Sequence, residues 1–145
     1  MYTVPETSYM TLIGGVNVDI ETWRDEQKIR YIALMIRLQI GVEDYFSHLA
    51  SLSGQPSVIL CDGGVMDYAA LLTPDQWQLV MDENGWNPVT LRDKRYDVVI
   101  HMVSAADGAE KFFVAESGVK GMSVEEAKVL DKKIVHAWVG HPHFL

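Results

Sequence analysis

The sequence has a single cysteine, few basic residues and no long apolar run, and each shortage excludes a class of protein. Cys61 cannot form an intramolecular disulfide, which favours a reducing compartment. The sequence has 12 Lys and Arg residues and 20 Asp and Glu residues. The resulting net charge of -8 argues against nucleic-acid binding. No apolar stretch reaches the roughly 18 residues of a membrane span, and the N-terminus lacks the basic and apolar regions of a secretory signal. We therefore expect a cytoplasmic protein without a transmembrane segment.

A phosphate-binding loop is also missing. The sequence contains no Gly-Lys dipeptide, so the G-x-x-x-x-G-K-[ST] motif is absent, and it contains no G-x-G-x-x-G motif. The chain thus lacks the two glycine-rich motifs that most often hold nucleotide phosphates.

Three short segments have the composition of strands. Residues 2–4 are β-favouring and Pro5 ends the ladder, while 57–61 and 98–103 are continuous apolar runs. Continuous apolar strands are typical of a parallel sheet covered on both faces, so we expect both runs to be buried. Residues 11–23, which include Gly14-Gly15, predict a loop.

Helical signals alternate with these strands. Apolar residues at helical spacing predict a long helix over 25–52, apolar on two faces, and capping boxes at Thr73 and Ser123 predict two further helices. This alternation predicts a single α/β domain over residues 1–145, with a parallel sheet and flanking helices. Arg37 lies in the middle of the long helix and needs a partner; a salt bridge to a carboxylate is one interpretation and anion binding the other.

Two carboxylates follow predicted strands. Asp62 ends the run at 57–61 and Glu6 comes soon after the first strand, so parallel strands place both at one edge of the sheet, where α/β proteins bind ligands. A carboxylate there suits Mg²⁺ together with phosphate oxygens. The alternatives are a turn residue for Asp62 and a solvated loop carboxylate for Glu6.

Other reactive residue types have simpler interpretations. His136, His141 and His143 lack the ligand spacing of a known metal site. His101 and Cys61 lie within apolar strands, which predicts a hydrogen-bonded core histidine and a small core side chain.

Several longer motifs resemble one family along nearly the whole chain. They are Val4-Pro5-Glu6, Val58-Ile59-Leu60-Cys61-Asp62, Asn84-Gly85-Trp86-Asn87, Leu91-Arg92-Asp93, Arg95-Tyr96-Asp97, Val99-Ile100-His101, Ala105-Ala106-Asp107-Gly108-Ala109-Glu110, Leu130-Asp131-Lys132-Lys133 and Ala137-Trp138-Val139-Gly140-His141-Pro142. With these motifs the chain resembles the NadR/Ttd-type AAA domain of the P-loop NTPases, a family that includes regulators of TRP-like channel trafficking.

The resemblance implies a partial P-loop, nucleoside-kinase-like fold that lacks the first strand, the Walker A loop and its helix, with a sheet edge and an apolar face left exposed. It also implies that the chain is truncated at both ends. Glu6 and Asp62 would be catalytic, with Asp62 on the Mg²⁺ side, and Arg37 and Lys120 would bind nucleotide or phosphate. Intact relatives would use Mg²⁺ with GTP or ATP, and their partners would be phosphoinositide lipids or membrane-trafficking proteins.

Two departures from the family pattern argue against catalysis. Asp62-Gly63-Gly64 stands where the family has Asp-Arg-Gly, and Lys120 stands where it has an arginine, which alone grips phosphate bidentately. Arginines that stabilise the transition state of phosphoryl transfer accelerate the reaction on the order of 10³- to 10⁵-fold. We therefore expect a chain that is not catalytically competent and binds no cofactor tightly. The alternatives are a small-molecule kinase domain of the ribosylnicotinamide or nucleoside type, in which Glu6 would act on the acceptor hydroxyl, and a noncatalytic interaction module.

Overall fold

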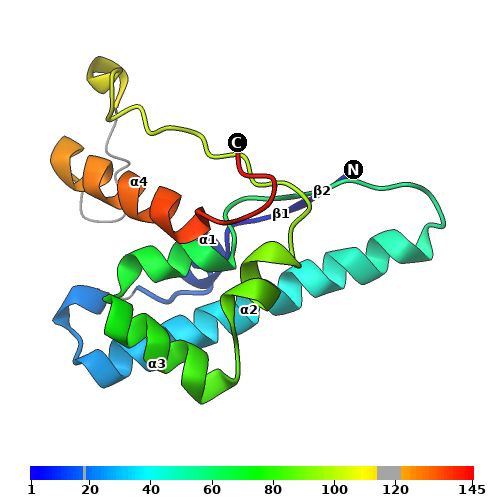
Figure 1. Cartoon of the computed structure of the whole chain (residues 1–145), viewed down its shortest axis with the longest axis horizontal. Coiled ribbons are helices and arrows are strands. Elements are labelled where there is room, and N and C mark those ends of the chain that lie inside the picture. Colours follow the sequence, from blue (N-terminus) through cyan, green and yellow to red (C-terminus); the bar gives the residue numbers. More distant parts are fainter. Residues whose placement is uncertain (18, 114–121) are drawn as a thin grey trace.

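The fold was analysed in a computed structural model, which describes residues 1–17, 19–113 and 122–145 (Figure 1). The elements in chain order are β1 (Tyr2–Val4), α1 (Thr7–Ile13), η1 (Ile20–Thr22), α2 (Asp25–Leu52), β2 (Ile59–Cys61), η2 (Val65–Leu71), α3 (Pro74–Asn84), η3 (Val89–Asp93), η4 (Glu110–Phe112) and α4 (Val124–Trp138). Among the described residues, no helix combines the length and the apolar character that crossing a membrane requires.

The sheet consists of two short parallel strands joined by the long crossover through α2. Tyr2 pairs with Ile59 and Val4 with Cys61, and the amide of Asp62 donates to the Val4 carbonyl at 3.0 Å. Val4 is fully buried, and the sheet packs against α2. The strands therefore run together and end at the same side of the molecule.

The helices form where the sequence provides their ends. At α3, the Thr73 hydroxyl accepts from the Gln76 amide at 3.3 Å, and Gly85 closes the helix in the left-handed conformation with φ 65°. At α4, the Ser123 hydroxyl accepts from the Glu126 amide at 3.2 Å. The predicted long helix over 25–52 and both capping boxes are confirmed.

The hydrophobic core lies between α2, η2, α3 and α4. Ile32 and Ile36 of α2 are fully buried, and Trp138 at the end of α4 is 4% exposed. These side chains belong to one cluster with Val65, Val80 and Leu91. The core is thus built mainly by helices, and the sheet contributes Val4 at its margin.

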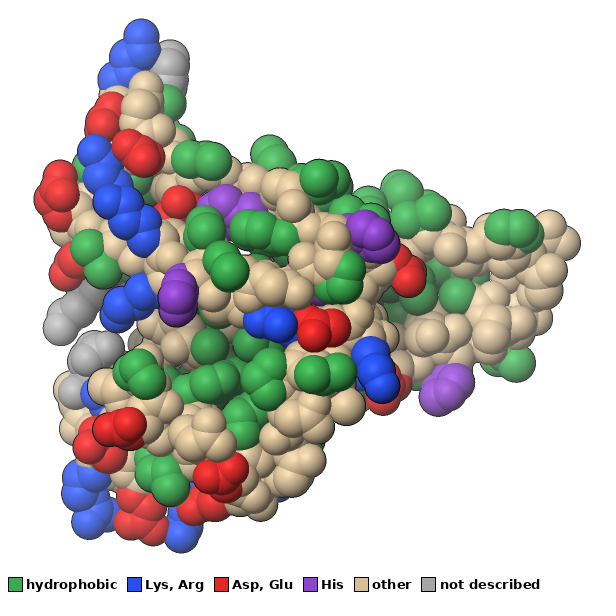
Figure 2. Space-filling model, in the orientation of Figure 1, with side chains coloured by type: hydrophobic (Ala, Val, Ile, Leu, Met, Phe, Trp, Pro, Cys, Tyr) green, Lys and Arg blue, Asp and Glu red, His purple; other side chains and the backbone are tan. Residues whose placement is uncertain are grey.

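The strand predictions are only partly correct. Tyr2–Val4 is a strand as expected, and Ile59–Cys61 falls within the predicted run. Residues 98–103 form no strand in the structure, where Val99 makes an isolated parallel bridge with Phe144. The expectation of burial on both faces is wrong for both runs, because Val58, Leu60, Ile100 and Met102 are exposed. Uncovered hydrophobic side chains are visible on the face in Figure 2.

The prediction of a loop over residues 11–23 is also wrong in part. α1 continues to Ile13, and η1 forms a short helical turn at Ile20–Thr22. The physical reason lies upstream, because Thr7 is fully buried and its hydroxyl donates to Gln39 of α2 at 2.8 Å. This tertiary contact fixes a helix whose own sequence carries weak helical signals.

Candidate functional site

Glu6 and Asp62 lie at the same end of the sheet. β1 and β2 are parallel and pair Val4 with Cys61, so Glu6 follows its strand by two residues and Asp62 follows directly. Both side chains are exposed, and Glu6 accepts a hydrogen bond from the Ser8 hydroxyl. The structure therefore brings these two predicted site residues to one edge.

The turn after Asp62 leads into a third carboxylate, Asp67. One oxygen accepts from the Trp138 indole nitrogen at 2.6 Å and the other from the Gly64 amide at 2.9 Å. Burial raises the pKa of Asp67, an effect that the hydrogen bond from Trp138 opposes and the negative charge of Glu6 reinforces. Asp67 is thus held by α4 and the turn, while Asp62 is exposed.

Gly64 allows this close packing. A Cβ atom added there would lie 2.7 Å from the Trp138 ring, closer than carbon atoms can approach. Gly63, with φ 76°, makes the preceding bend in a conformation that favours glycine. The Asp62-Gly63-Gly64 turn is therefore shaped by its contact with α4.

A cavity of about 910 Å³ opens beside this turn. It is lined by β2 with the turn that follows, by the segment from Lys94 to Met102, and by side chains of α2 and α4, and its lining includes Asp62, Asp67 and Trp138. We call this space the inter-strand cleft. Its volume is within the range of small-molecule sites, and the exposed carboxylate of Asp62 is part of its lining.

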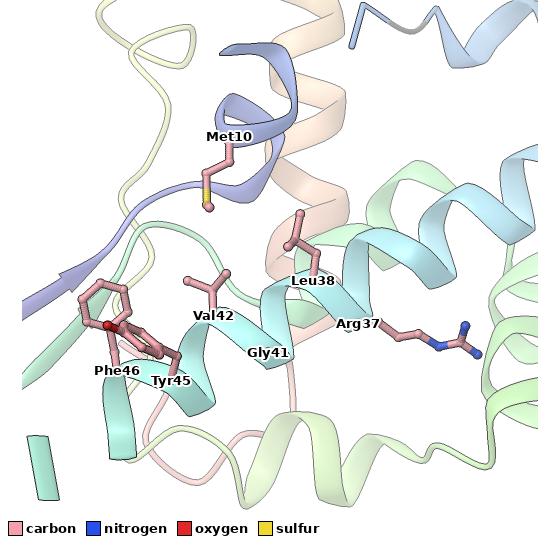
Figure 3. Close-up of a pocket in the computed structure, with 7 residues that line it drawn as sticks. All are labelled: Met10, Arg37, Leu38, Gly41, Val42, Tyr45 and Phe46. Atoms are coloured by element: carbon pink, nitrogen blue, oxygen red, sulfur yellow. The ribbon is translucent and has the colours of Figure 1, made fainter. Parts of the chain in front are cut away.

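Arg37 lies away from this edge. It is exposed, donates to the Asn84 side-chain oxygen and stands 5.9 Å from the centre of the Trp86 ring. Figure 3 shows its guanidinium turned away from Met10 and Phe46, which line the same shallow apolar groove on α2. The predicted salt bridge to a carboxylate is therefore wrong, because an amide and an aromatic face at the end of α3 provide the partners.

Lys120, the other predicted phosphate-binding residue, lies outside the described residues. The structure thus unites Glu6 and Asp62 and separates Arg37 from them.

Sequence reasoning missed a buried polar network centred on Glu43, which is 7% exposed. The Glu43 carboxylate forms a salt bridge with Arg95. It also accepts hydrogen bonds from the Tyr96 hydroxyl at 2.8 Å and from the side-chain amide of Gln39 at 2.7 Å. Tyr96 also accepts from the Val65 amide at 2.9 Å, and burial raises the pKa of its hydroxyl. The network joins α2 to η2 and to the segment after η3, so it positions one wall of the inter-strand cleft.

A signal for this network exists in the sequence. One face of α2 carries residues at helical spacing, namely Ile32, Ile36, Gln39 and Glu43. The first two are apolar, whereas Gln39 and Glu43 are polar residues on the same face. Buried polar side chains need partners, and Arg95-Tyr96 supplies both a cation and a hydroxyl.

Cys61 and His101 both line the inter-strand cleft. Burial, with a further contribution from the charge of Glu43, raises the pKa of the Cys61 thiol from 9.0 to about 11, so little thiolate forms near neutral pH. His101 Nε2 lies 3.2 Å from an Asp131 oxygen, in poor geometry for a hydrogen bond. Cys61 therefore lacks the surroundings of an activated nucleophile.

No group of three or more His, Cys, Asp or Glu side chains in the described parts of the chain is placed to hold a metal ion. A Mg²⁺ ion at Asp62 would thus take its other ligands from phosphate oxygens and water, which is a common arrangement for this ion. Asp62 fits such a role because its carboxylate is exposed at the strand end.

Comparison with family models, with curated proteins and with solved structures finds no match for this chain.

Proposed function

We propose that this chain is the carboxylate-bearing part of a P-loop-type nucleotide-binding domain, and that by itself it binds nucleotide weakly or not at all. The supporting observation is the β1–β2 pairing, which puts Glu6 and Asp62 at the same carboxyl end of a parallel sheet. That edge is where open α/β sheets bind ligands. The resemblance to the NadR/Ttd-type AAA domain gives the proposal its ligand class, GTP or ATP with Mg²⁺.

The two carboxylates would have separate tasks. Asp62 would meet the cation that accompanies the phosphates, because its side chain is exposed beside the inter-strand cleft. Glu6 would face the distal side of the ligand from the end of β1. Asp67 would hold the turn in place through Trp138 and Gly64.

Weak binding follows from the groups that would grip the phosphates. The sequence has no glycine–lysine loop, and Arg37 is engaged by Asn84 and Trp86 at another face. Carboxylates alone repel phosphate, so any binding depends on the bridging cation.

The test is a titration of the protein with Mg²⁺ and GTP, followed by amide chemical shifts. We expect shifts at Asp62, Gly63 and Gly64 at millimolar nucleotide, only with Mg²⁺ present, and their loss in Asp62→Asn. The matched control is Asp82→Asn, an exposed carboxylate on α3 that should change nothing. Mg²⁺-dependent shifts confined to other parts of the chain would refute the site at Asp62, and micromolar affinity would refute the expected weakness.

The noncatalytic interaction module remains a second candidate because one observation favours it. The inter-strand cleft is bordered by exposed apolar side chains, including Leu60, Ile100 and Met102. Contiguous exposed apolar surface is one mark of a protein interaction site.

A further inference from the structure

Two sides of the inter-strand cleft, β2 and the segment around residues 98–102, carry backbone groups that pair with no strand among the described residues. On β2, Val58 accepts from the Tyr2 amide at 2.9 Å and the Asp62 amide donates to Val4 at 3.0 Å. Backbone groups alternate in direction along a strand, so those of Ile59 and Cys61 point away from β1 and into the cleft. Within the described residues, β2 pairs with β1 alone.

The opposite side has the complementary pattern. Val99 donates to His143 at 2.9 Å and accepts from Leu145 at 2.9 Å, and the His101 amide donates to Leu145 at 2.8 Å. By the same alternation, the backbone groups of Val98, Ile100 and Met102 point away from the C-terminal residues. In the described parts of the chain no strand pairs with this edge.

The two edges border one cavity and are apolar. Ile59, Cys61, Val98 and Ile100 all line the cleft, whose volume is about 910 Å³. Ile100 is 68% exposed and Met102 is 82% exposed. In Figure 1, β2 and the segment that contains 98–103 run in the same general direction across the molecule. The cleft thus lies between two pairs of backbone-bonded segments. One pair is the strands β1 and β2, and the other is residues 98–101 with 143–145, which share a single isolated bridge.

We propose that the inter-strand cleft is a strand-acceptor site, filled by a separate extended polypeptide segment that runs parallel to β2 and joins the two pairs into one sheet. Such a segment would bond through its main chain to both edges, while its side chains cover the exposed apolar residues. Carboxylates outnumber Lys and Arg among the lining residues, five to two. The segment that fits is therefore β-branched and apolar, with basic residues beside it.

A second copy of this chain does not fit the cleft. Each described strand already has one partner, so it offers a single free edge, whereas the cleft needs a strand that is free on both sides. Each copy also carries a net charge of -8, which opposes association. The occupant is thus a strand that is unpaired before it binds.

The probe is a fluorescein-labelled peptide, Lys-Val-Thr-Val-Ile-Val-Lys, titrated with the protein without nucleotide or Mg²⁺ and followed by anisotropy. We expect saturable binding, and at least tenfold weaker binding of the peptide whose central Val is replaced by Pro, because Pro lacks the donor and breaks the ladder. Hydrogen exchange should show Ile59, Cys61 and Ile100 amides protected only with peptide present.

The variant Ile100→Pro removes one cleft-facing donor and leaves the bonds of Val99 and His101 to the C-terminal residues in place. We expect this variant to bind the peptide about tenfold more weakly, since one carbonyl of the bound peptide is then buried without a hydrogen-bond donor. The matched control is Thr3→Pro, which removes a backbone N–H donor from the outer edge of β1. The affinity of this variant for the peptide should stay within about twofold of that of the unchanged protein.

Three results would overturn the proposal: no saturable binding by the parent protein, equal binding of the two peptides, or a dimer that buries these amides and excludes the peptide. The exchange measurement needs no variant, so it decides even where Ile100→Pro is unstable. The assay contains no nucleotide, so its failure leaves the proposed role of Asp62 to its own titration.

Discussion

The core between the helices of this molecule is closed, whereas the apolar segments around residues 58–60 and 98–103 are open. In the helical part, Ile36 is fully buried and Trp138 is 4% exposed. In the strand part, residues of equal hydrophobicity face solvent, with Ile100 at 68% exposed. Among the residues that the structure describes, the apolar side chains on the inner helix faces are covered, whereas Val58, Leu60, Ile100 and Met102 are not. The contrast predicts that the buried helix faces contribute most of the stability and that the exposed segments contribute little.

The strongest test of this contrast compares one residue from each part. Trp138→Ala should lower the free energy of unfolding by about 3–5 kcal/mol, because it empties the contact between α4 and η2. Ile100→Ala should change it by less than about 0.5 kcal/mol, as expected for an exposed side chain. Urea unfolding followed by circular dichroism measures both. A cost above about 2 kcal/mol for Ile100→Ala would show that the strand edge is covered.

The buried polar network allows a second test. Tyr96→Phe removes the hydroxyl that donates to Glu43 and accepts from Val65. Leaving buried groups without partners should cost about 1–3 kcal/mol. Tyr45→Phe, at an exposed tyrosine, is the control and should be close to neutral. Equal stability of the two variants would mean that water replaces the Tyr96 hydroxyl.

Arg37 should contribute less. Its bond to Asn84 and its place over Trp86 are both at the surface, so Arg37→Ala should cost at most about 1 kcal/mol. The same variant should leave the Mg²⁺- and GTP-dependent shifts at Asp62 unchanged, because Arg37 contacts α3 and not the strand ends. Loss of those shifts would return Arg37 to the ligand site.

The smallest effect concerns alkaline pH. Burial raises the pKa of Cys61 from 9.0 to about 11 and raises those of Tyr68 and Tyr96. Each folded pKa exceeds its unfolded value, so the folded state holds these protons longer, and stability falls as pH rises above about 9. Cys61→Ala should make this fall shallower between pH 9 and 11, as measured by urea unfolding at several pH values. An identical slope would show that the thiol does not titrate in this range.

Local chemistry made much of the helical part predictable. The Thr73 and Ser123 caps act within four residues, so the starts of α3 and α4 follow from sequence alone. Residues 98–103 do not form a strand because their bonds to residues 143–145 amount to a single bridge, between Val99 and Phe144, and not to a ladder. The composition of residues 98–103 favours a strand, but whether the strand forms depends on a neighbouring strand that the composition does not reveal.

The site divides in the same way. That Glu6 and Asp62 share an edge could be predicted, because parallel pairing alone determines which ends meet. The partner of Arg37 could not be predicted from spacing, since Asn84 and Trp86 are 47 and more residues away along the chain. The Glu43 network needed the three-dimensional approach of Arg95 and Tyr96 to α2.

The contact between Trp138 and Asp67 gives the protein a built-in optical reporter. Trp138 is buried, whereas Trp23, Trp77 and Trp86 are only half-buried, so the most blue-shifted emission should come from the indole at the junction of α4 and η2. Separation of α4 from η2 would expose the Trp138 ring to water and shift its fluorescence to the red. Movements of this helix can therefore be followed in the unmodified chain, without an attached dye.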